Sequence, residues 1–160
     1  MYKILFLFII PFFFTACSEK NNAFKYFEKD DLEIKSVQYT KKTDIVKDNE
    51  VDVIFMATYL NKVDKEIFGL NDDSFLVSLY FSNKDTQDIN ENEYILTLND
   101  VPSISLEKIE KNNERFKSLM LKNSWGSTYL VKFNPQNSHK LVLTLKNNSS
   151  TNMVHLNFEK

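Results

Sequence analysis

The stretch VDVIFMATY, residues 51–59, decides the fold, because apolar residues recur at every second position along it. Five of these residues share one face: Val51, Val53, Phe55, Ala57 and Tyr59. Alternate side chains of an extended chain lie on the same face of a strand, so this period indicates a β-strand with one face directed at a core. The intervening Ile54 and Met56 are apolar as well.

The same alternation is expected from Leu32 onward. It is clearest in five later segments: residues 75–81, 94–98, 129–133, 141–145 and 154–158. Polar clusters rich in Asn separate the segments at residues 61–62, 71–74, 112–113, 134–135 and 147–150. The chain has only two glycines, and Asn tolerates the left-handed conformation that a tight turn needs. We therefore expect short strands joined by tight turns.

Short alternating strands separated by regularly spaced turn residues predict an all-β fold, an antiparallel β-sandwich of about seven to nine strands. The sequence argues against a parallel α/β fold, since no long amphipathic helix is expected between the strands. Residues 106–121 are ambiguous, because their apolar positions fit a helix about as well as a hairpin. Two consecutive Asn residues, Asn112 and Asn113, weaken a helix and suit a tight turn, so the hairpin is favoured.

The first sixteen residues differ in composition from the rest of the chain. Lys3 precedes ILFLFIIPFFF, residues 4–14, which contains no charged or polar residue and is followed by Thr15, Ala16 and Cys17. A short basic region, an apolar run and small residues describe a secretory signal. The run is too short for a membrane-spanning helix, which needs about 20 apolar residues.

Residues 14–17 (FTAC) resemble the lipobox of bacterial lipoproteins, with Phe14 where that family usually has Leu. The resemblance implies cleavage before Cys17 and attachment of diacylglycerol and a further acyl chain, such as palmitate, to that residue. Because Ser18 rather than Asp follows Cys17, it also implies a place in the cell envelope at the outer membrane. The expected division is a signal peptide (1–16), a lipidated tether and N-terminal arm (17–31) and a sandwich domain (32–160).

The segment 123–133 (NSWGSTYLVKF) and the final VHLNFEK, residues 154–160, are similar to small immunoglobulin-like lipoproteins of AT-rich Gram-negative bacteria. The likeness lies in the strand rhythm and an aromatic–Gly corner, and it covers about half of the chain. It implies an immunoglobulin-like sandwich and carries over no functional residue.

Composition argues against nucleic acid as a partner. The formal net charge is −2, and Arg115 is the only Arg among 20 basic residues. Nucleic-acid binding requires a basic footprint that this chain lacks.

Candidate metal and acid–base groups are few. The only cysteine, Cys17, is assigned to lipid, and a hairpin at residues 139–159 would pair His155 near Leu143 or Thr144, too far from His139 for a shared metal. Residues 85–93 (DTQDINENE) alternate oxygen ligands but fail the calcium-loop template, so a solvated loop is favoured over a weak divalent-ion site. The adjacent pairs Asp30-Asp31 and Asp72-Asp73 are assigned to turns and caps.

Trp125, beside Gly126, is the candidate contact residue. A plug that closes the sandwich end is favoured over a contact for a ligand or partner, since Trp buries a large area. Together these features predict a membrane-anchored lipoprotein that acts as a non-enzymatic binding or envelope accessory module, without cofactor or metal. Its partner would be a protein or a glycan. The alternatives are a cell-surface adhesin and an enzyme that acts on cell wall or glycan.

Overall fold

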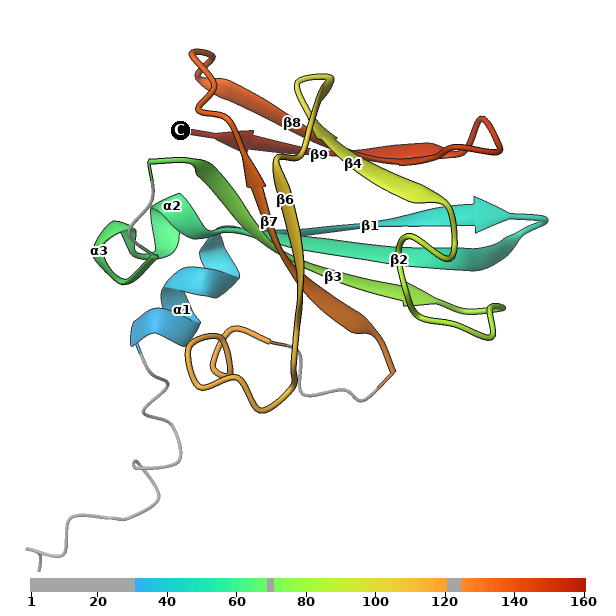
Figure 1. Cartoon of the computed structure of the whole chain (residues 1–160), viewed down its shortest axis with the longest axis horizontal. Helices are drawn as coiled ribbons and strands as arrows, with labels where there is room; N and C mark the ends of the chain where they lie inside the picture. The colour runs from blue at the N-terminus through green and yellow to red at the C-terminus, as the bar shows by residue number, and fades with distance from the viewer. Residues whose placement is uncertain (1–30, 69–70, 121–124) are drawn as a thin grey trace, which may run out of the picture.

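The computed structural model describes residues 31–68, 71–120 and 125–160, which fold into two facing antiparallel sheets (Figure 1). The five-stranded sheet has the order β1 (Thr40–Lys47), β2 (Glu50–Tyr59), β3 (Asp73–Phe81), β7 (Ser127–Phe133), β6 (Ser105–Ile109). The four-stranded sheet has the order β5 (Val101–Pro102), β4 (Tyr94–Leu98), β8 (Lys140–Asn147), β9 (Met153–Glu159). The predicted antiparallel sandwich is confirmed, with nine strands in the described part of the chain.

The main core lies between the two sheets. Alternate side chains of β2, β3 and β7 meet those of β4, β8 and β9, and the large ones that are fully buried include Phe55, Phe75, Phe81, Tyr129, Phe133, Leu98, Leu141 and Leu143. Burying a side chain of this size contributes about 1.5–3 kcal/mol, so this core stabilises the sandwich. Of the predicted face of residues 51–59, all but Val51 are buried; Val51 is 40% exposed.

A second, smaller core covers part of the outer face of the five-stranded sheet. It is formed by the short helices α2 (Leu60–Val63) and α3 (Lys65–Phe68), by the segment 110–120 and by outward side chains of β3, β6 and β7. Phe68 and Phe116 stack at 5.6 Å, and the guanidinium of Arg115 lies over both rings. The outer face of this sheet is therefore only partly open to solvent.

Two sequence predictions are wrong near the start of the domain, and one strand there was not predicted. Residues 31–38 form the helix α1 (Asp31–Gln38), not an alternating strand, and the acidic Asp31 and Glu33 in its first turn favour a helix N-terminus. The predicted turn at residues 61–62 lies inside α2. The strand β1 was not singled out, because Ile45 is its only buried residue and the apolar period is therefore absent.

The favoured hairpin within residues 106–121 is also wrong, and the helix alternative does not describe the segment either. Ser105–Ile109 forms β6, which pairs with β7, so the partner strand lies outside the segment. The chain then makes successive turns, in which Phe116 N–H donates to the Asn113 carbonyl at 3.2 Å and Met120 N–H to the Phe116 carbonyl at 3.0 Å. Ile109 and Phe116 both enter the second core, which explains a path that local pattern did not predict.

Asn and Asp take the place of Gly in two tight turns, but neither turn lies in one of the Asn clusters from which turns were predicted (residues 61–62, 71–74, 112–113, 134–135 and 147–150). Asp48 and Asn49 join β1 to β2 with φ values of 52° and 65°, and Asn99 and Asp100 join β4 to β5 with 49° and 67°. Positive φ at both central residues describes the turn that matches the twist of a two-residue hairpin. The predicted hairpin of residues 139–159 is confirmed as β8 and β9.

A polar group around the buried Asp73 carboxylate is here called the Asp73 clasp (the side chains of Tyr59, Asp73 and Lys160 and the backbone N–H of Gln136). It ties strands β2 and β3 to the β7–β8 connection and to the residue that follows β9. Asp73, assigned from sequence to a turn or cap, is only 3% exposed. Its carboxylate accepts hydrogen bonds from the Tyr59 hydroxyl at 2.8 Å and from Gln136 N–H at 2.7 Å, and it lies 2.9 Å from Lys160 Nζ. The carboxylate is thus satisfied on both oxygens, and the turn-or-cap assignment is wrong.

We expect the free energy of unfolding to fall as the pH rises above about 10, where tyrosine in an unfolded chain loses its proton. Burial, with the Asp73 hydrogen bond, raises the pKa of Tyr59, and burial also raises the pKa of Tyr94 and Tyr129. Above pH 10 the unfolded state therefore binds fewer protons than the folded state, so the stability that these groups contribute below pH 10 is lost as the pH rises. Urea unfolding at a series of pH values measures this. Tyr94→Phe, which removes one such group, should make the decline shallower, and an unchanged decline would contradict the assignment.

Candidate functional site

Trp125 lies on the surface and not in the sandwich end, so the favoured plug interpretation is wrong. Its side chain is 70% exposed, the highest value among the large exposed hydrophobic residues that the structure describes. The nearest aromatic ring belongs to Tyr80 of β3, with a centroid separation of 6.4 Å and an interplanar angle of 46°. We call Tyr80 and Trp125 the aromatic platform.

Gly126 fixes the backbone beneath the platform. It directly precedes Ser127, which pairs with Leu79 across β3 and β7. A Cβ atom at Gly126 would collide with the backbone carbonyl oxygen of Leu79. The close approach of the two backbones therefore requires Gly, and it holds Trp125 next to Tyr80.

We expect Gly126→Ala to lower the free energy of unfolding by about 1–3 kcal/mol, the usual effect of forcing an extra group into a packed site. The Leu79 carbonyl is backbone, so it cannot move aside as a flexible side chain would. Urea unfolding followed by circular dichroism measures the change without relying on the fluorescence of Trp125. Asn137→Ala, at an exposed loop position, serves as the control, and equal stabilities of the two variants would contradict the close approach.

The platform continues into a hollow along the same sheet face. Tyr80, Ser78 and Leu76 alternate outward on β3, and Ser78 is the strand partner of Met56 on β2. Residues two apart on a strand are about 7 Å apart. The platform thus begins roughly one such step beyond Ser78, which lines the hollow described next.

This hollow, here called the α1 groove, has a volume of about 530 Å³. Its lining residues come from β2 and β3, which form its floor, from β1 at one border, and from α1 and residues 118–120, which form its walls. Its side chains are mainly aliphatic, thioether and hydroxyl groups: Val37, Thr40, Met56, Thr58, Leu76, Ser78, Ser118, Leu119 and Met120, with Glu33, Ser36, Lys41 and Lys42 also contributing. Volumes of 300–1,000 Å³ with mostly apolar walls are typical of ligand sites.

The rim of the α1 groove is apolar on its helical side. Val37 of α1 lines the groove and is 62% exposed, and Ile34, one turn earlier on α1, is 45% exposed but is not part of the groove's lining. Their spacing of three residues places them on one helix face. This pair was the sequence signal that could have indicated the groove, and it was missed because residues 31–38 were assigned to a strand pattern.

The two histidines lie apart, as predicted. His155 is the strand partner of Thr144, and its Nδ1 is 2.8 Å from the Thr144 hydroxyl oxygen. His139 is exposed and precedes β8. In the described ranges no three or more His, Cys, Asp or Glu side chains gather into a group that could hold a metal ion.

The acidic loop 85–93 folds back on its own polar groups. The Asp88 carboxylate accepts the Asn90 N–H at 2.9 Å and lies 3.7 Å from Lys108 Nζ. Burial acts to raise the pKa of Asp88, but the backbone hydrogen bonds and the Lys108 ammonium outweigh it and hold this pKa below its ordinary value. The loop is also fixed from beneath, because Ile89 N–H donates to the buried Tyr129 hydroxyl at 3.0 Å.

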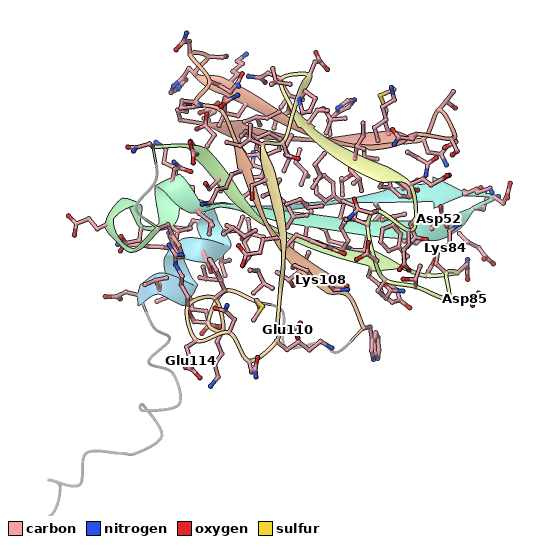
Figure 2. All side chains as sticks on the ribbon, viewed as in Figure 1. Asp52, Lys84, Asp85, Lys108, Glu110 and Glu114 are labelled. Carbon is pink, nitrogen blue, oxygen red and sulfur yellow. The ribbon has the colours of Figure 1, made fainter. Side chains whose placement is uncertain are left out.

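A second, polar pocket of about 250 Å³ lies at the end of the sandwich where β2 begins. Asp52 and Lys84 are at this end, away from Glu110 and Glu114, which follow β6 (Figure 2). Glu93 also lines the pocket, and its carboxylate accepts a hydrogen bond from the Ser149 hydroxyl. The pocket therefore combines side chains of both charge signs.

Cys17 and Asp30 lie outside the described residues, and Asp31 is in the first turn of α1. No helix within residues 31–68, 71–120 and 125–160 is both long and apolar enough to cross a membrane. Comparisons with protein-family models, with curated proteins and with solved structures found no match to this chain.

Proposed function

We propose that this protein is a lipid-anchored, non-enzymatic binding module of the cell envelope and that it contacts a partner protein through the aromatic platform. The observation that carries the proposal is the 70% exposure of Trp125 beside Tyr80. Trp and Tyr are enriched among the residues that supply most of the binding energy at protein interfaces. Gly126 brings the backbone next to Trp125 close to Leu79 of β3, which places Trp125 beside Tyr80.

The lipobox-like residues 14–17 support the anchor. Fourteen residues lead from Cys17 to Asp31, where α1 begins, so an extended tether would span at most roughly 50 Å. The domain would thus work within that distance of the membrane. Two or more acyl chains give stable attachment, whereas one chain is marginal.

A partner outside the cell would make the protein an adhesin, and a partner inside the envelope would make it an accessory of an envelope complex. Treating intact cells with a protease distinguishes them, with a periplasmic protein as the leakage control. Cleavage in intact cells places the domain outside. Protection that is lost only after the outer membrane is permeabilised places it in the periplasm.

Photo-crosslinking in cells tests the platform. A benzophenone amino acid at position 125 is expected to yield one discrete adduct, and Tyr80→Ala is expected to diminish it. Position 95 is the matched control, because Ile95 is an exposed aliphatic residue (39%) on the outer face of the four-stranded sheet. The absence of an adduct at position 125, or the same adducts at positions 125 and 95, would contradict the proposal. Turnover of an envelope substrate that is lost on mutation of Asp52 or Glu93 would favour the enzyme alternative.

A further inference from the structure

The α1 groove differs in chemistry from the aromatic platform. Its apolar side chains are aliphatic or thioether groups, and Met56 and Met120 face it from the floor and from one wall. Methionine is unbranched and flexible, so it adapts to a ligand that has no fixed shape. Such a lining suits a flexible aliphatic chain better than a rigid ring.

One border of the groove is basic. Lys42 lies on the groove side of β1, since its strand partner is Met56 of the floor. Its ammonium lies 3.3 Å from the Asp44 carboxylate, but these side chains are 48% and 31% exposed, and exposed pairs of this kind contribute little to stability. Lys42 is therefore able to exchange Asp44 for the carboxylate of a ligand. The Thr40 hydroxyl donates to the Ser36 carbonyl and bonds the Thr58 hydroxyl, both at 2.6 Å, so Lys42 is the group that a carboxylate would meet at this border.

We propose that the α1 groove binds the acyl chain of a free fatty acid, with its carboxylate at Lys42. The volume of about 530 Å³ and the apolar wall of Val37, Leu119 and Met120 suit the chain, and the basic border suits the carboxylate. The supply of such a ligand rests on the proposed function, because α1 begins fourteen residues from the proposed lipid on Cys17. Binding itself does not depend on the anchor or on the platform.

The test uses the mature chain with Cys17→Ser and the naturally fluorescent fatty acid cis-parinaric acid. Saturable binding is expected. Val37→Glu, which places a charge on the apolar wall, should weaken it at least about tenfold. Lys42→Gln should weaken binding of the acid several-fold but leave binding of the corresponding neutral alcohol unchanged. The controls Ile95→Glu and Lys146→Gln, a neighbouring pair on the outer face of the four-stranded sheet, should bind like the parent chain.

Several results would overturn the proposal. They are the absence of saturable binding and equal losses of binding in the Val37→Glu and Ile95→Glu variants. A third is binding that appears only after Phe24 and Phe27 of the N-terminal arm (17–31) are replaced by Ser, which would mean that the protein's own chain fills the groove. Binding of the domain to phosphatidylglycerol vesicles that is lost in Val37→Glu would assign the groove to a bilayer instead. If no fatty acid binds but the crosslinked adduct at position 125 persists, only the groove proposal fails and the proposed function stands. If fatty acid binds but no adduct forms at position 125, the proposed function fails and the groove proposal stands.

Discussion

Asp73→Ala is expected to lower the free energy of unfolding by at least about 1–3 kcal/mol, the cost of leaving a buried hydrogen-bonding group without its partner. Asp73 is 3% exposed and lies 2.9 Å from Lys160 Nζ. Its removal also leaves the Tyr59 hydroxyl and the Gln136 N–H without their acceptor. A buried donor that loses its acceptor adds its own desolvation cost. Urea unfolding of the soluble mature chain measures the change.

Two variants serve as controls for this effect. Asp72→Ala removes the neighbouring carboxylate and should change stability by no more than about 0.5 kcal/mol. Asp73→Asn keeps one acceptor oxygen, which can serve either Tyr59 or Gln136 but not both, so it should cost less than Asp73→Ala. Equal effects of Asp72→Ala and Asp73→Ala would show that the Asp73 clasp does not stabilise the fold.

Cys17→Ser is expected to abolish lipid attachment, and in a chain whose residues 1–16 are replaced by a signal peptide that is cleaved independently of the lipobox, it is expected to move the protein from the membrane fraction to the soluble fraction. Each buried methylene of an acyl chain contributes about 0.8 kcal/mol, so two or three chains hold a protein stably and their loss releases it. Membrane fractionation and metabolic labelling with a clickable palmitate analogue measure the two effects together. The hydroxyl of Ser cannot form the thioether, so the label should be lost as well.

The control for this prediction changes the next residue. Ser18→Asp should keep the palmitate label and the membrane attachment while moving the protein from the outer to the inner membrane. If Cys17→Ser left the protein labelled and in the membrane fraction, the lipobox interpretation of residues 14–17 would be wrong.

The strands of the main core could be predicted because burial of alternate side chains between the two sheets determines their sequence pattern. In β2, β3, β7, β8 and β9 every second side chain enters the space between the sheets, and the period of two is written directly into the sequence. The edge strand β1 contributes only Ile45 to the core, so no such period exists to be found. The same reason explains α1, whose only buried residue is Ser36.

The second core and the Asp73 clasp could not be predicted from local pattern. Phe116 packs on Phe68, which belongs to a distant part of the chain, and Asp73 meets Lys160 across the sandwich. Neither partner is indicated by the residues next to it. The plug prediction for Trp125 was wrong for a related reason, since an aromatic residue before Gly is compatible with either burial or exposure, and the local sequence does not decide between them.

The exposure of Trp125 is the claim on which the proposed function depends, and tryptophan fluorescence tests it most directly. Trp125 is the only Trp in the chain, so the emission spectrum of the folded domain reports on it alone. We expect emission at the red wavelengths of water-exposed indole, ready quenching by acrylamide, and little further red shift when urea unfolds the domain. Blue-shifted emission that is protected from acrylamide and moves to the red on unfolding would mean that Trp125 is a buried plug, and it would contradict the aromatic platform.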